Sequence, residues 1–331
     1  MKIMVYEARP DERADLEKQA ALHGVELSVT DAVPTLENAS LAAGCIGVSI
    51  LGQGCIDAAL LDAYHALGIR YLSTRTIGYD HIDLDHARSI GLRVCSASYA
   101  PNGVADFTVM MILMCLRHYK QALWRGQVND FSLTGLQGRE MKDLTIGIIG
   151  TGRIGAQVVR NLSGFGCRIL AYDLRHNPAV EPQVTYVDFD TLLAQSDVIT
   201  LHMPLLDSNR HIINRESVAK MRDGVVIVNC SRGELADIEA LIEGIETGKI
   251  GALGMDTVEG DEGIIHADHR VDILPNRNWF YLHQFRNVIM TQHMAFYTDA
   301  AVSSMVDCGI GGICQMAAGE SCPTELTGPV Q

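Results

Sequence analysis

The sequence predicts an α/β protein with two doubly wound parallel sheets, one in each of two domains. Short β-branched runs alternate with helical stretches along the chain, and a glycine follows several of the helical stretches. This alternation is typical of βαβ units, in which helices connect parallel strands and cover the sheet. The chain has 331 residues, which is long for one domain and comfortable for two.

The first hundred residues contain one complete series of these units. Gly24, Gly68 and Gly91 come just after helical patterns, where a glycine readily ends a helix. We expect strands at 2–6, 44–51, 70–76 and 92–96, and helices at 11–23, at 57–67 and directly before Gly91.

A long apolar helix separates this series from a second one. We expect it to start after Pro101 and Asn102 and to continue to about Val128. Because it is apolar on all sides (VADFTVMMILMCL), we expect it to be buried between domains or between the subunits of a homodimer. Six buried strands then follow in order, as in the six-stranded dinucleotide-binding fold. They are expected at 145–150, 167–173, 197–204, 224–230, 251–256 and 287–293.

The composition argues against several classes of partner. The formal net charge is −14, whereas nucleic-acid binding depends on Lys and Arg side chains that neutralise phosphates. The same charge disfavours anionic membrane surfaces, and the longest apolar stretch, around 104–116, is too short and interrupted to span a bilayer. The nine cysteines form no CxxC pair and the N-terminus has no signal-peptide pattern, so we expect a cytoplasmic protein.

A glycine-rich turn with the sequence GTGRIG predicts a dinucleotide site, because it follows an apolar strand and opens a helical pattern. Gly150 permits the tight turn, Gly152 lets the backbone approach a pyrophosphate, and Gly155 lets the helix and strand pack closely. The phosphates would then rest on the helix N-terminus, where Arg153 and Ile154 lie.

An acidic residue in the next strand indicates which dinucleotide is bound. Asp173 ends that strand, 18 residues after Gly155, where a carboxylate accepts hydrogen bonds from ribose hydroxyls. This carboxylate would repel a ribose 2′-phosphate, so NAD is favoured over NADP. Arg175 would soften that choice only if it faced the ribose, and we interpret it as a solvated loop side chain.

The position of the glycine turn predicts how the domains are arranged. It comes after a complete α/β series, so the cofactor domain should be inserted into another domain. We expect a Rossmann NAD domain at residues 100–296. The flavodoxin-like substrate domain would then combine residues 1–99 with residues 297–331, which return to it as a helix and tail.

Three polar residues lie at the ends of later strands and predict an active site. Arg232, Asp256 and His293 each follow an apolar run, and ligands bind outside the carboxyl ends of strands in open α/β sheets. A guanidinium matches a substrate carboxylate with two parallel donors. An imidazole exchanges a proton near neutral pH, and an adjacent carboxylate would raise its pKa. These groups are those that the reduction of a 2-keto acid requires.

Several motifs together resemble the D-isomer-specific 2-hydroxyacid dehydrogenase family, most closely its D-lactate dehydrogenase group, which includes the vancomycin-resistance type. The resemblance covers nearly the whole chain, and its motifs are fairly specific and independent of one another. They are RYLSTRTIGYDHIDL, SYAPNGVADF, the GTGRIG unit, SDVITLHMPL, IVNCSRGELAD, GALGMD and TQHMAFYT.

The resemblance implies a role for each of these residues. Arg232 would bind the substrate carboxylate and carbonyl, His293 would be the acid/base, and Asp256 would hold the nicotinamide carboxamide. The remaining assignments are backbone N–H groups near Ile77 and Gly78 for the substrate carboxylate, Tyr99 and Phe296 for the substrate pocket, and His202, Pro204, Asn229 and Cys230 for the edge of the cofactor.

One position departs from the family pattern. Five residues after Asp256, where the family carries a glutamate that partners the histidine, this chain has Asp261. Aspartate keeps the charge but is one methylene shorter, so we favour Asp261 as the catalytic partner of His293. Glu262 and Glu259 remain alternatives.

Most of the twelve histidines have simpler explanations than catalysis. His81, His86, His118 and His211 are expected at the surface, and His202 should be a packed or cofactor-edge residue. The segment from His266 to His269 resembles a metal ligand set only superficially. No matching ligand pair is evident elsewhere, so we expect a polar loop there and no metal.

The sequence therefore predicts an NAD-dependent enzyme that converts a 2-keto acid to the (R)-2-hydroxy acid, with pyruvate and D-lactate as the default pair. A larger substrate is the first alternative, such as 2-ketoisocaproate, phenylpyruvate or 2-oxoglutarate. A non-enzymatic NAD-sensing protein is the second, because members of the family that act as transcriptional corepressors share this fold.

Overall fold

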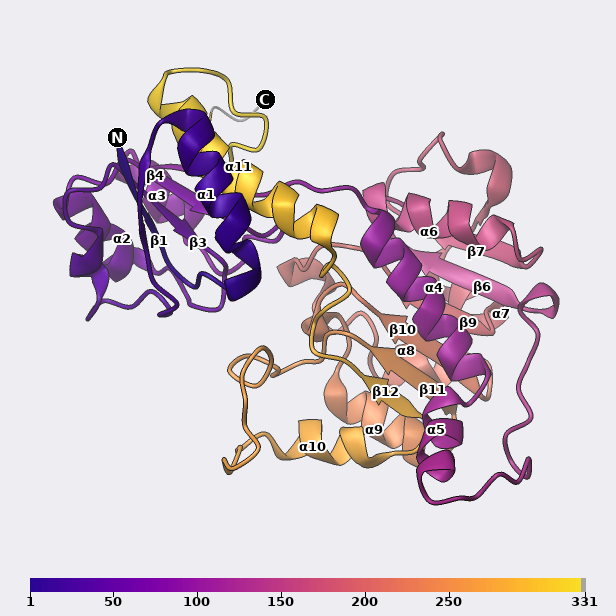
Figure 1. Ribbon diagram of the computed structural model, residues 1–331. Helices are drawn as coiled ribbons and strands as arrows, with labels where there is room; N and C mark the ends of the chain where they lie inside the picture. Colours follow the sequence, from indigo (N-terminus) through magenta and orange to yellow (C-terminus); the bar gives the residue numbers. More distant parts are fainter. Residues whose placement is uncertain (329–331) are drawn as a thin grey trace. The chain divides into compact units, whose positions relative to one another are not determined.

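The computed structural model describes residues 1–328 and shows two compact units. Unit 2 comprises Pro101–Phe296. Unit 1 comprises Met1–Ala100 together with the segment that begins at Tyr297. Each unit is an α/β layer structure with its own parallel sheet (Figure 1).

Unit 1 is built on a five-stranded parallel sheet in the order β2-β1-β3-β4-β5. This doubly wound order places a crevice at the carboxyl ends of β1 and β3, where the winding reverses. The sequence pattern does not reveal β2, because this edge strand is half-exposed and has no apolar run. The strands are β1 (Lys2–Val5), β2 (Glu26–Val29), β3 (Gly47–Ile50), β4 (Tyr71–Thr74) and β5 (Arg93–Cys95).

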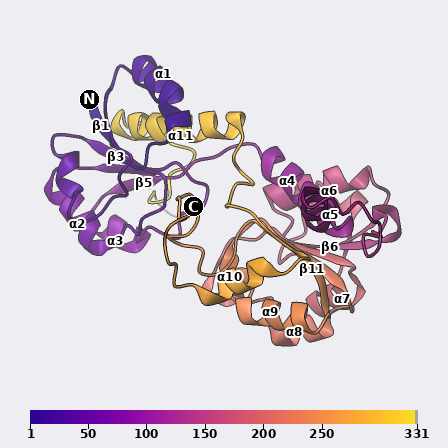
Figure 2. The ribbon, with the colours of Figure 1, turned by 60° about the horizontal axis from the view of Figure 1, so that its bottom comes forward.

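Helices cover both faces of the unit 1 sheet (Figures 1 and 2). The helices α1 (Arg13–His23) and α11 (Asp299–Ala317) pack on one face, with α2 (Ala58–Ala66) and α3 (Leu84–Ser89) on the other. Glycines at 24, 68 and 91 have positive φ, as the predicted helix ends require. Beyond α11, the chain returns along β5 through an antiparallel pairing of Cys95 with Glu325.

Within the described residues, α11 is the one helix long and apolar enough to cross a membrane by length and composition. About half of it, 56%, is buried inside unit 1. There Val306, Ile310 and Ile313 pack with Ile3 and Val5 of β1. Such contacts are typical of a helix in the core of a globular domain.

Unit 2 contains a seven-stranded parallel sheet in the order β12-β11-β10-β9-β6-β7-β8. All six predicted strands are present. The prediction of six strands is nevertheless one too few, because β8 has only two residues and leaves no periodic pattern. The strands are β6 (Thr145–Ile149), β7 (Arg168–Tyr172), β8 (Thr185–Tyr186), β9 (Val198–Leu201), β10 (Val225–Asn229), β11 (Ile250–Met255) and β12 (Val288–Met290).

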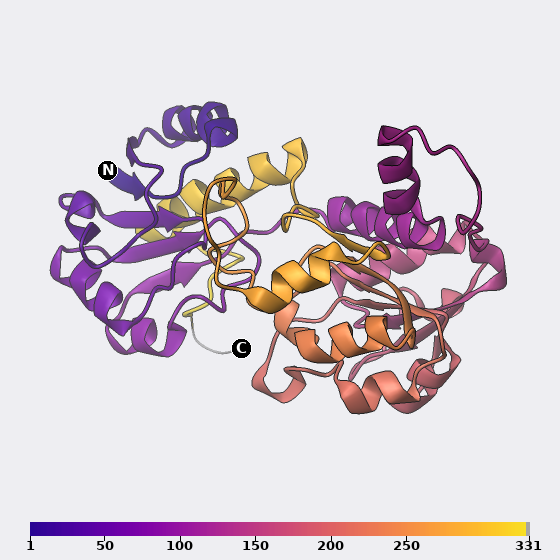
Figure 3. The same ribbon diagram turned by 90° about the horizontal axis from the view of Figure 1, so that it is seen from below.

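The unit 2 sheet is also covered on both faces (Figures 1 and 3). The helices α4 (Asn102–Leu116) and α6 (Arg153–Ser163) pack against each other on one face. The opposite face is covered by α7 (Phe189–Gln195), α8 (Arg215–Lys220), α9 (Ile238–Glu246) and α10 (Arg277–Gln284).

The prediction of one continuous helix to Val128 is wrong. The helix breaks at His118, whose backbone is left-handed with φ +50°, and α5 (Tyr119–Gln127) starts after the break. Before the break, α4 buries eight residues within unit 2, whereas α5 buries none. Figure 3 shows α5 and the loop that follows it projecting from the rest of unit 2. Several large apolar side chains of α5 and its loop are therefore exposed, whereas those of α4 are mostly buried.

Candidate active site

The glycine turn after β6 has the geometry of a phosphate site. Gly150 is left-handed, with φ +93°, and a Cβ at Gly155 would overlap the Gly150 carbonyl oxygen. Gly152 is the residue before α6, and the position of a Cβ there meets no atom within 4 Å. Open space therefore lies in front of a three-turn helix whose first residues are Arg153 and Ile154, and this space fits a pyrophosphate.

The carboxylate of Asp173 lies beside this turn at the end of β7. It accepts N–H groups from Thr151 at 2.6 Å and Arg175 at 3.0 Å, and the Thr151 hydroxyl at 3.1 Å. Partial burial alone raises the pKa of Asp173, but these donors outweigh it and lower the pKa below its usual value. An ionised carboxylate at this point fits the hydroxyls of a ribose.

Two residues that the sequence motifs did not single out support the same turn. The Asn177 side chain donates to the Thr151 carbonyl at 2.8 Å, and the Tyr186 hydroxyl donates to the Thr151 hydroxyl at 2.9 Å. The Tyr186 ring stacks on His176, with centroids 3.9 Å apart. Tyr186 belongs to the unpredicted strand β8, so no sequence motif indicated this support.

His202 and Cys230 lie where a cofactor edge is expected, and both are kept uncharged. Burial lowers the pKa of His202 to about 3, and its ring bonds to the Thr200 hydroxyl at 3.0 Å. The backbone of His202 backs the glycine turn, since a Cβ at Gly150 would lie 2.7 Å from its carbonyl oxygen. Burial, and then the nearby charge of Asp256, raise the pKa of the Cys230 thiol. Neither residue is suited to acid/base or nucleophilic chemistry near neutral pH.

The turn after β10 holds Arg232 in a defined position. The buried side chain of Asn229 accepts the N–H and hydroxyl of Ser231 at 3.0 and 2.8 Å, and donates to the Arg232 carbonyl at 2.7 Å. The next residue must be glycine, because a Cβ at Gly233 would overlap the backbone of Val258. Arg232 therefore projects from a rigid turn at the carboxyl end of β10.

Asp256, at the end of β11, connects this turn to the segment that carries His293. Its N–H donates to the Asn229 carbonyl at 2.9 Å. Its carboxylate, 1% exposed, accepts the Thr291 hydroxyl at 2.6 Å and the N–H groups of Met294 at 2.9 Å and Ala295 at 2.8 Å. Asp256 thus holds the Thr291 side chain before His293 and the backbone directly after it.

His293 follows β12 and lies beside two aromatic rings of unit 2. Its ring centroid is 6.3 Å from that of Phe296 and 6.1 Å from that of His266. The segment from His266 to His269 lies in a loop, as predicted, and His269 pairs with Asp272 there. The sequence did not predict that His266 would reach the segment of His293, 27 residues away.

The three acidic candidates for a partner of His293 have different surroundings. Glu259 pairs with His211 at 2.6 Å and also accepts the Ile238 N–H, so it is held elsewhere. Glu262 is exposed. Burial, assisted by neighbouring carboxylates, raises the pKa of Asp261 to about 7. A carboxyl that changes charge near neutrality is the type found at catalytic sites.

In unit 1, the residues expected to meet the substrate lie at the carboxyl edge of the sheet. Ile77 and Gly78 follow β4, and Tyr99 follows β5. The Thr76 hydroxyl donates to the Gly78 carbonyl at 2.7 Å, and the Ala97 N–H donates to the Thr76 carbonyl at 2.9 Å. These contacts join the two segments at the same edge.

A buried carboxylate organises the loop that follows β3 at this edge. Glu7, 3% exposed, accepts the four consecutive backbone N–H groups of residues 51–54, three of them at 2.8–3.1 Å. The fully buried Arg75 donates to the Glu7 carbonyl at 3.3 Å and forms an ion pair with Glu12 at 2.8 Å. No sequence motif indicated this arrangement.

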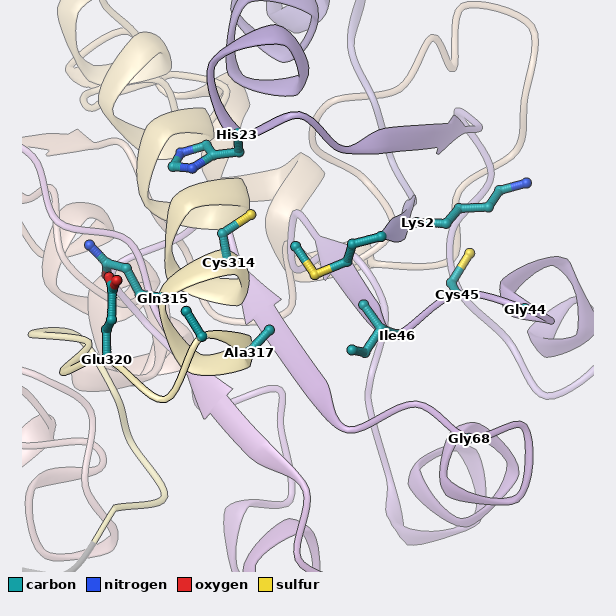
Figure 4. Close-up of a pocket in the computed structure, with 12 residues that line it drawn as sticks. Lys2, His23, Gly44, Cys45, Ile46, Gly68, Cys314, Gln315, Ala317 and Glu320 are labelled. Atoms are coloured by element: carbon teal, nitrogen blue, oxygen red, sulfur yellow. The ribbon is translucent and has the colours of Figure 1, made fainter.

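A cavity of about 800 Å³ lies at the opposite edge of the unit 1 sheet (Figure 4). It is lined by the starts of β1, β3 and β4, including Lys2 and Ile46, and by Cys314 and Gln315 near the end of α11. Ligands of parallel α/β sheets bind at the carboxyl ends of the strands. This cavity is therefore not the predicted substrate site.

The comparisons with known proteins agree with this geometry. The family model described as "D-isomer specific 2-hydroxyacid dehydrogenase, NAD binding domain" matches residues 109–295, more than half of the chain. The chain belongs to the D-isomer-specific 2-hydroxyacid dehydrogenases. It is therefore an NAD-dependent oxidoreductase of that family. Its glycine turn and Asp173 are the groups in unit 2 that fit the cofactor.

Relatives of this dehydrogenase act on different substrates. The aromatic 2-oxoacid reductase of Clostridium sporogenes is 42% identical over 311 residues, covering 93% of each chain. The D-lactate dehydrogenase of Escherichia coli has a TM-score of 0.87 at 36% identity, covering 98% of this chain and 100% of that one. The D-lactate dehydrogenase of Lactobacillus jensenii, solved with NAD⁺, has a TM-score of 0.84 at 32% identity, covering 98% and 99%.

Proposed function

We propose that this dehydrogenase reduces a 2-keto acid to the (R)-2-hydroxy acid through Arg232 and His293 at the carboxyl edge of the unit 2 sheet. The observation that carries the proposal is the hydrogen-bonded connection through Asn229 and Asp256. It ties the Arg232 turn and the His293 segment into one rigid arrangement. Bound NADH would supply the hydride.

The residues of unit 2 would hold the cofactor along the same edge. The amide groups at the start of α6, with Arg153 and Ile154, would bind the pyrophosphate in the space in front of Gly152. Asp173 would accept the ribose hydroxyls, and its negative charge would exclude a 2′-phosphate. His202, Pro204, Asn229 and Cys230 would border the cofactor. Asp256 would reach the nicotinamide carboxamide in addition to holding the His293 segment.

Each catalytic side chain would perform one part of the reduction. The Arg232 guanidinium would hold the substrate carboxylate and polarise the carbonyl oxygen. His293 would deliver a proton to that oxygen as the alkoxide forms. Asp261, when ionised, would stabilise the protonated imidazole. In unit 1, the N–H groups near Ile77 and Gly78 would bind the substrate carboxylate.

We favour an aromatic 2-keto acid, such as phenylpyruvate, over pyruvate. The observation that favours it is the 42% identity to the aromatic 2-oxoacid reductase, compared with 35–39% to D-lactate dehydrogenases. Tyr99 and Phe296 would line the pocket for the substrate side chain. Unit 1 would then be the substrate domain and unit 2 the NAD domain.

A substrate panel tests this proposal. NADH oxidation is measured with pyruvate, 2-ketoisocaproate, phenylpyruvate and 2-oxoglutarate, and we expect the highest kcat/KM with phenylpyruvate. A higher kcat/KM with pyruvate would reverse the substrate assignment but keep the reaction. Tight NADH binding without turnover of any of the four would instead favour an NAD-sensing protein.

We also propose that the enzyme is a cytoplasmic homodimer. Exposed apolar side chains gather on α5 and the following loop, and surfaces of this kind mark protein interfaces. They are Tyr119, Leu123, Trp124, Val128, Phe131 and Leu133, which are 46–83% exposed. Sedimentation velocity should give a dimer, and Trp124→Asp should shift it toward the monomer. A monomeric wild-type enzyme would contradict the proposal.

The cytoplasmic location is supported by the cysteines. All nine are free thiols, which fits a reducing compartment.

A further inference from the structure

The peptide group that joins His293 to Met294 is held at both ends. Its N–H, from Met294, donates to the Asp256 carboxylate at 2.9 Å. Its carbonyl oxygen, from His293, lies 3.2 Å from the Nε2 atom of His266. A carbonyl oxygen only accepts hydrogen bonds, so His266 must be the donor in this contact. The two contacts together fix the plane of this peptide group.

The plane of this peptide group matters because the backbone of His293 is left-handed, with φ +52°. Residues other than glycine adopt this conformation at a cost, and the surrounding contacts must maintain it. The direction of the His293 side chain follows from its backbone angles. A contact that holds the His293 carbonyl therefore also holds the direction of the imidazole.

The loop after β11 brings His266 to this position. The Asp261 carbonyl accepts the N–H groups of Ile264 at 3.0 Å and Ile265 at 3.3 Å, which makes a turn directly before His266. His266 itself is left-handed, with φ +64°. Its ring faces the edge of Phe296, with centroids 6.4 Å apart. Asp261 and His266 are thus presented by the same turn.

We infer that His266 is a positioning residue for proton transfer, because its Nε2–H holds the His293 carbonyl and thereby orients the His293 imidazole. This inference rests on the proposed role of His293 as proton donor. The contact does not depend on the charge of His266, since the imidazolium and the neutral Nε2–H tautomer both donate from this atom. The loop therefore contributes an orienting contact as well as the acidic residue Asp261.

A matched pair of substitutions tests the hydrogen bond separately from the backbone. His266→Gln keeps an N–H donor at a similar reach, and His266→Met has a similar length without a donor. Both replacements carry a similar cost at φ +64° because neither is glycine. His269→Met is the control on the same loop, since His269 pairs locally with Asp272.

We expect His266→Met to lower kcat about tenfold, because misplacement of a reacting group costs rate rather than binding. The KM values for NADH and the 2-keto acid should change less than about twofold. His266→Gln and His269→Met should both retain kcat within about twofold. The melting temperatures of the two His266 variants should be equal.

Two results would overturn the inference: a wild-type kcat in His266→Met, or an equal loss of kcat in His266→Gln. The proposed function fails by a different result. It fails if the wild-type enzyme turns over no 2-keto acid, or if His293→Ala is as active as the wild type. The two hypotheses are therefore distinguished by different variants in the same assay.

Discussion

Each unit uses one buried carboxylate to hold a loop at the carboxyl edge of its sheet. In unit 1, Glu7 accepts four consecutive N–H groups of the loop 51–54. In unit 2, Asp256 accepts two N–H groups and a hydroxyl of the segment 291–295. The segment in unit 2 contains a proposed catalytic residue, whereas the loop in unit 1, with the sequence LGQG, contains none.

The difference indicates what each carboxylate contributes. Asp256 holds the segment of the proton donor, so its loss should act on the chemical step. Glu7 holds a loop that packs beside His81, since a Cβ at Gly52 would lie 3.0 Å from that ring. This loop is next to the expected substrate segment at Ile77, so loss of Glu7 should act on substrate binding.

The largest expected effect is that of Asp256→Ala. The substitution leaves two buried N–H groups and a hydroxyl without their acceptor and releases the segment around His293. We expect kcat to fall at least about a hundredfold, because positioning of a reacting group is lost. Steady-state kinetics with NADH and phenylpyruvate measure this. If kcat is unchanged and only the KM for NADH rises, Asp256 acts through the cofactor alone.

The second effect is that of Glu7→Ala, which should destabilise unit 1 by about 2–4 kcal/mol, because a buried carboxylate with several N–H donors is lost. The KM for the 2-keto acid should rise more than kcat falls, and the Kd for NADH should be unchanged. Urea denaturation and fluorescence titration with NADH measure these quantities. Glu7→Gln, which keeps one acceptor oxygen, should be intermediate. An increase in the Kd for NADH comparable to that in KM would contradict the contrast with Asp256.

The third effect is the pH dependence of stability that Asp261 causes. The pKa of Asp261 is raised to about 7 by burial, whereas the unfolded value is about 4. A raised pKa means that the folded state favours the protonated acid, so the wild type loses stability as pH rises from about 4 to 7. Asp261→Asn avoids that loss and should be more stable than the wild type at pH 8, by up to about 4 kcal/mol, and nearly equally stable at pH 4.

The activity of Asp261→Asn should change in the opposite direction. Below pH 7 the wild-type Asp261 is protonated and no longer stabilises a charged His293, so kcat/KM for reduction should decrease. At pH 8 the asparagine variant should have a lower kcat/KM than the wild type. Between pH 7 and 5 its kcat/KM should not show the decrease that protonation of Asp261 causes in the wild type. A pH profile measured for both proteins tests this, and identical profiles would exclude Asp261 as the partner of His293.

The smallest expected effect is that of Tyr186→Phe, which removes one hydrogen bond to Thr151 in the glycine turn. We expect the KM for NADH to increase about twofold to fivefold, as for loss of a single neutral hydrogen bond. The kcat should be unchanged, because β8 is at one side of the unit 2 sheet and β11 and β12, which precede Asp256 and His293, are at the other. A loss of kcat without a change in KM would show that Tyr186 acts elsewhere.

The sequence could predict features that depend on local pattern. The six predicted strands of unit 2 are apolar runs, and Gly150, Arg232 and His293 follow such runs within three residues. A residue at the end of a parallel strand lies at a known edge of the sheet, so its location follows from the strand alone. The cofactor assignment followed in the same way from Asp173.

The remaining features depend on contacts between distant residues or on very short elements. The two-residue β8 and the half-exposed β2 carry no periodic pattern, and no glycine or proline marks the helix break at His118. Glu7 meets a loop 44–47 residues away, and His266 meets His293 across 27 residues. Such pairings are set by tertiary packing, which a single sequence does not show.

The most direct test of the central claim compares the wild-type enzyme with His293→Ala in NADH-dependent reduction of phenylpyruvate. We expect (R)-phenyllactate as the product of the wild type and less than about 1% of its kcat in the variant, with NADH binding retained. A variant that keeps the wild-type kcat would exclude His293 as the proton donor, because the proton would then come from another group.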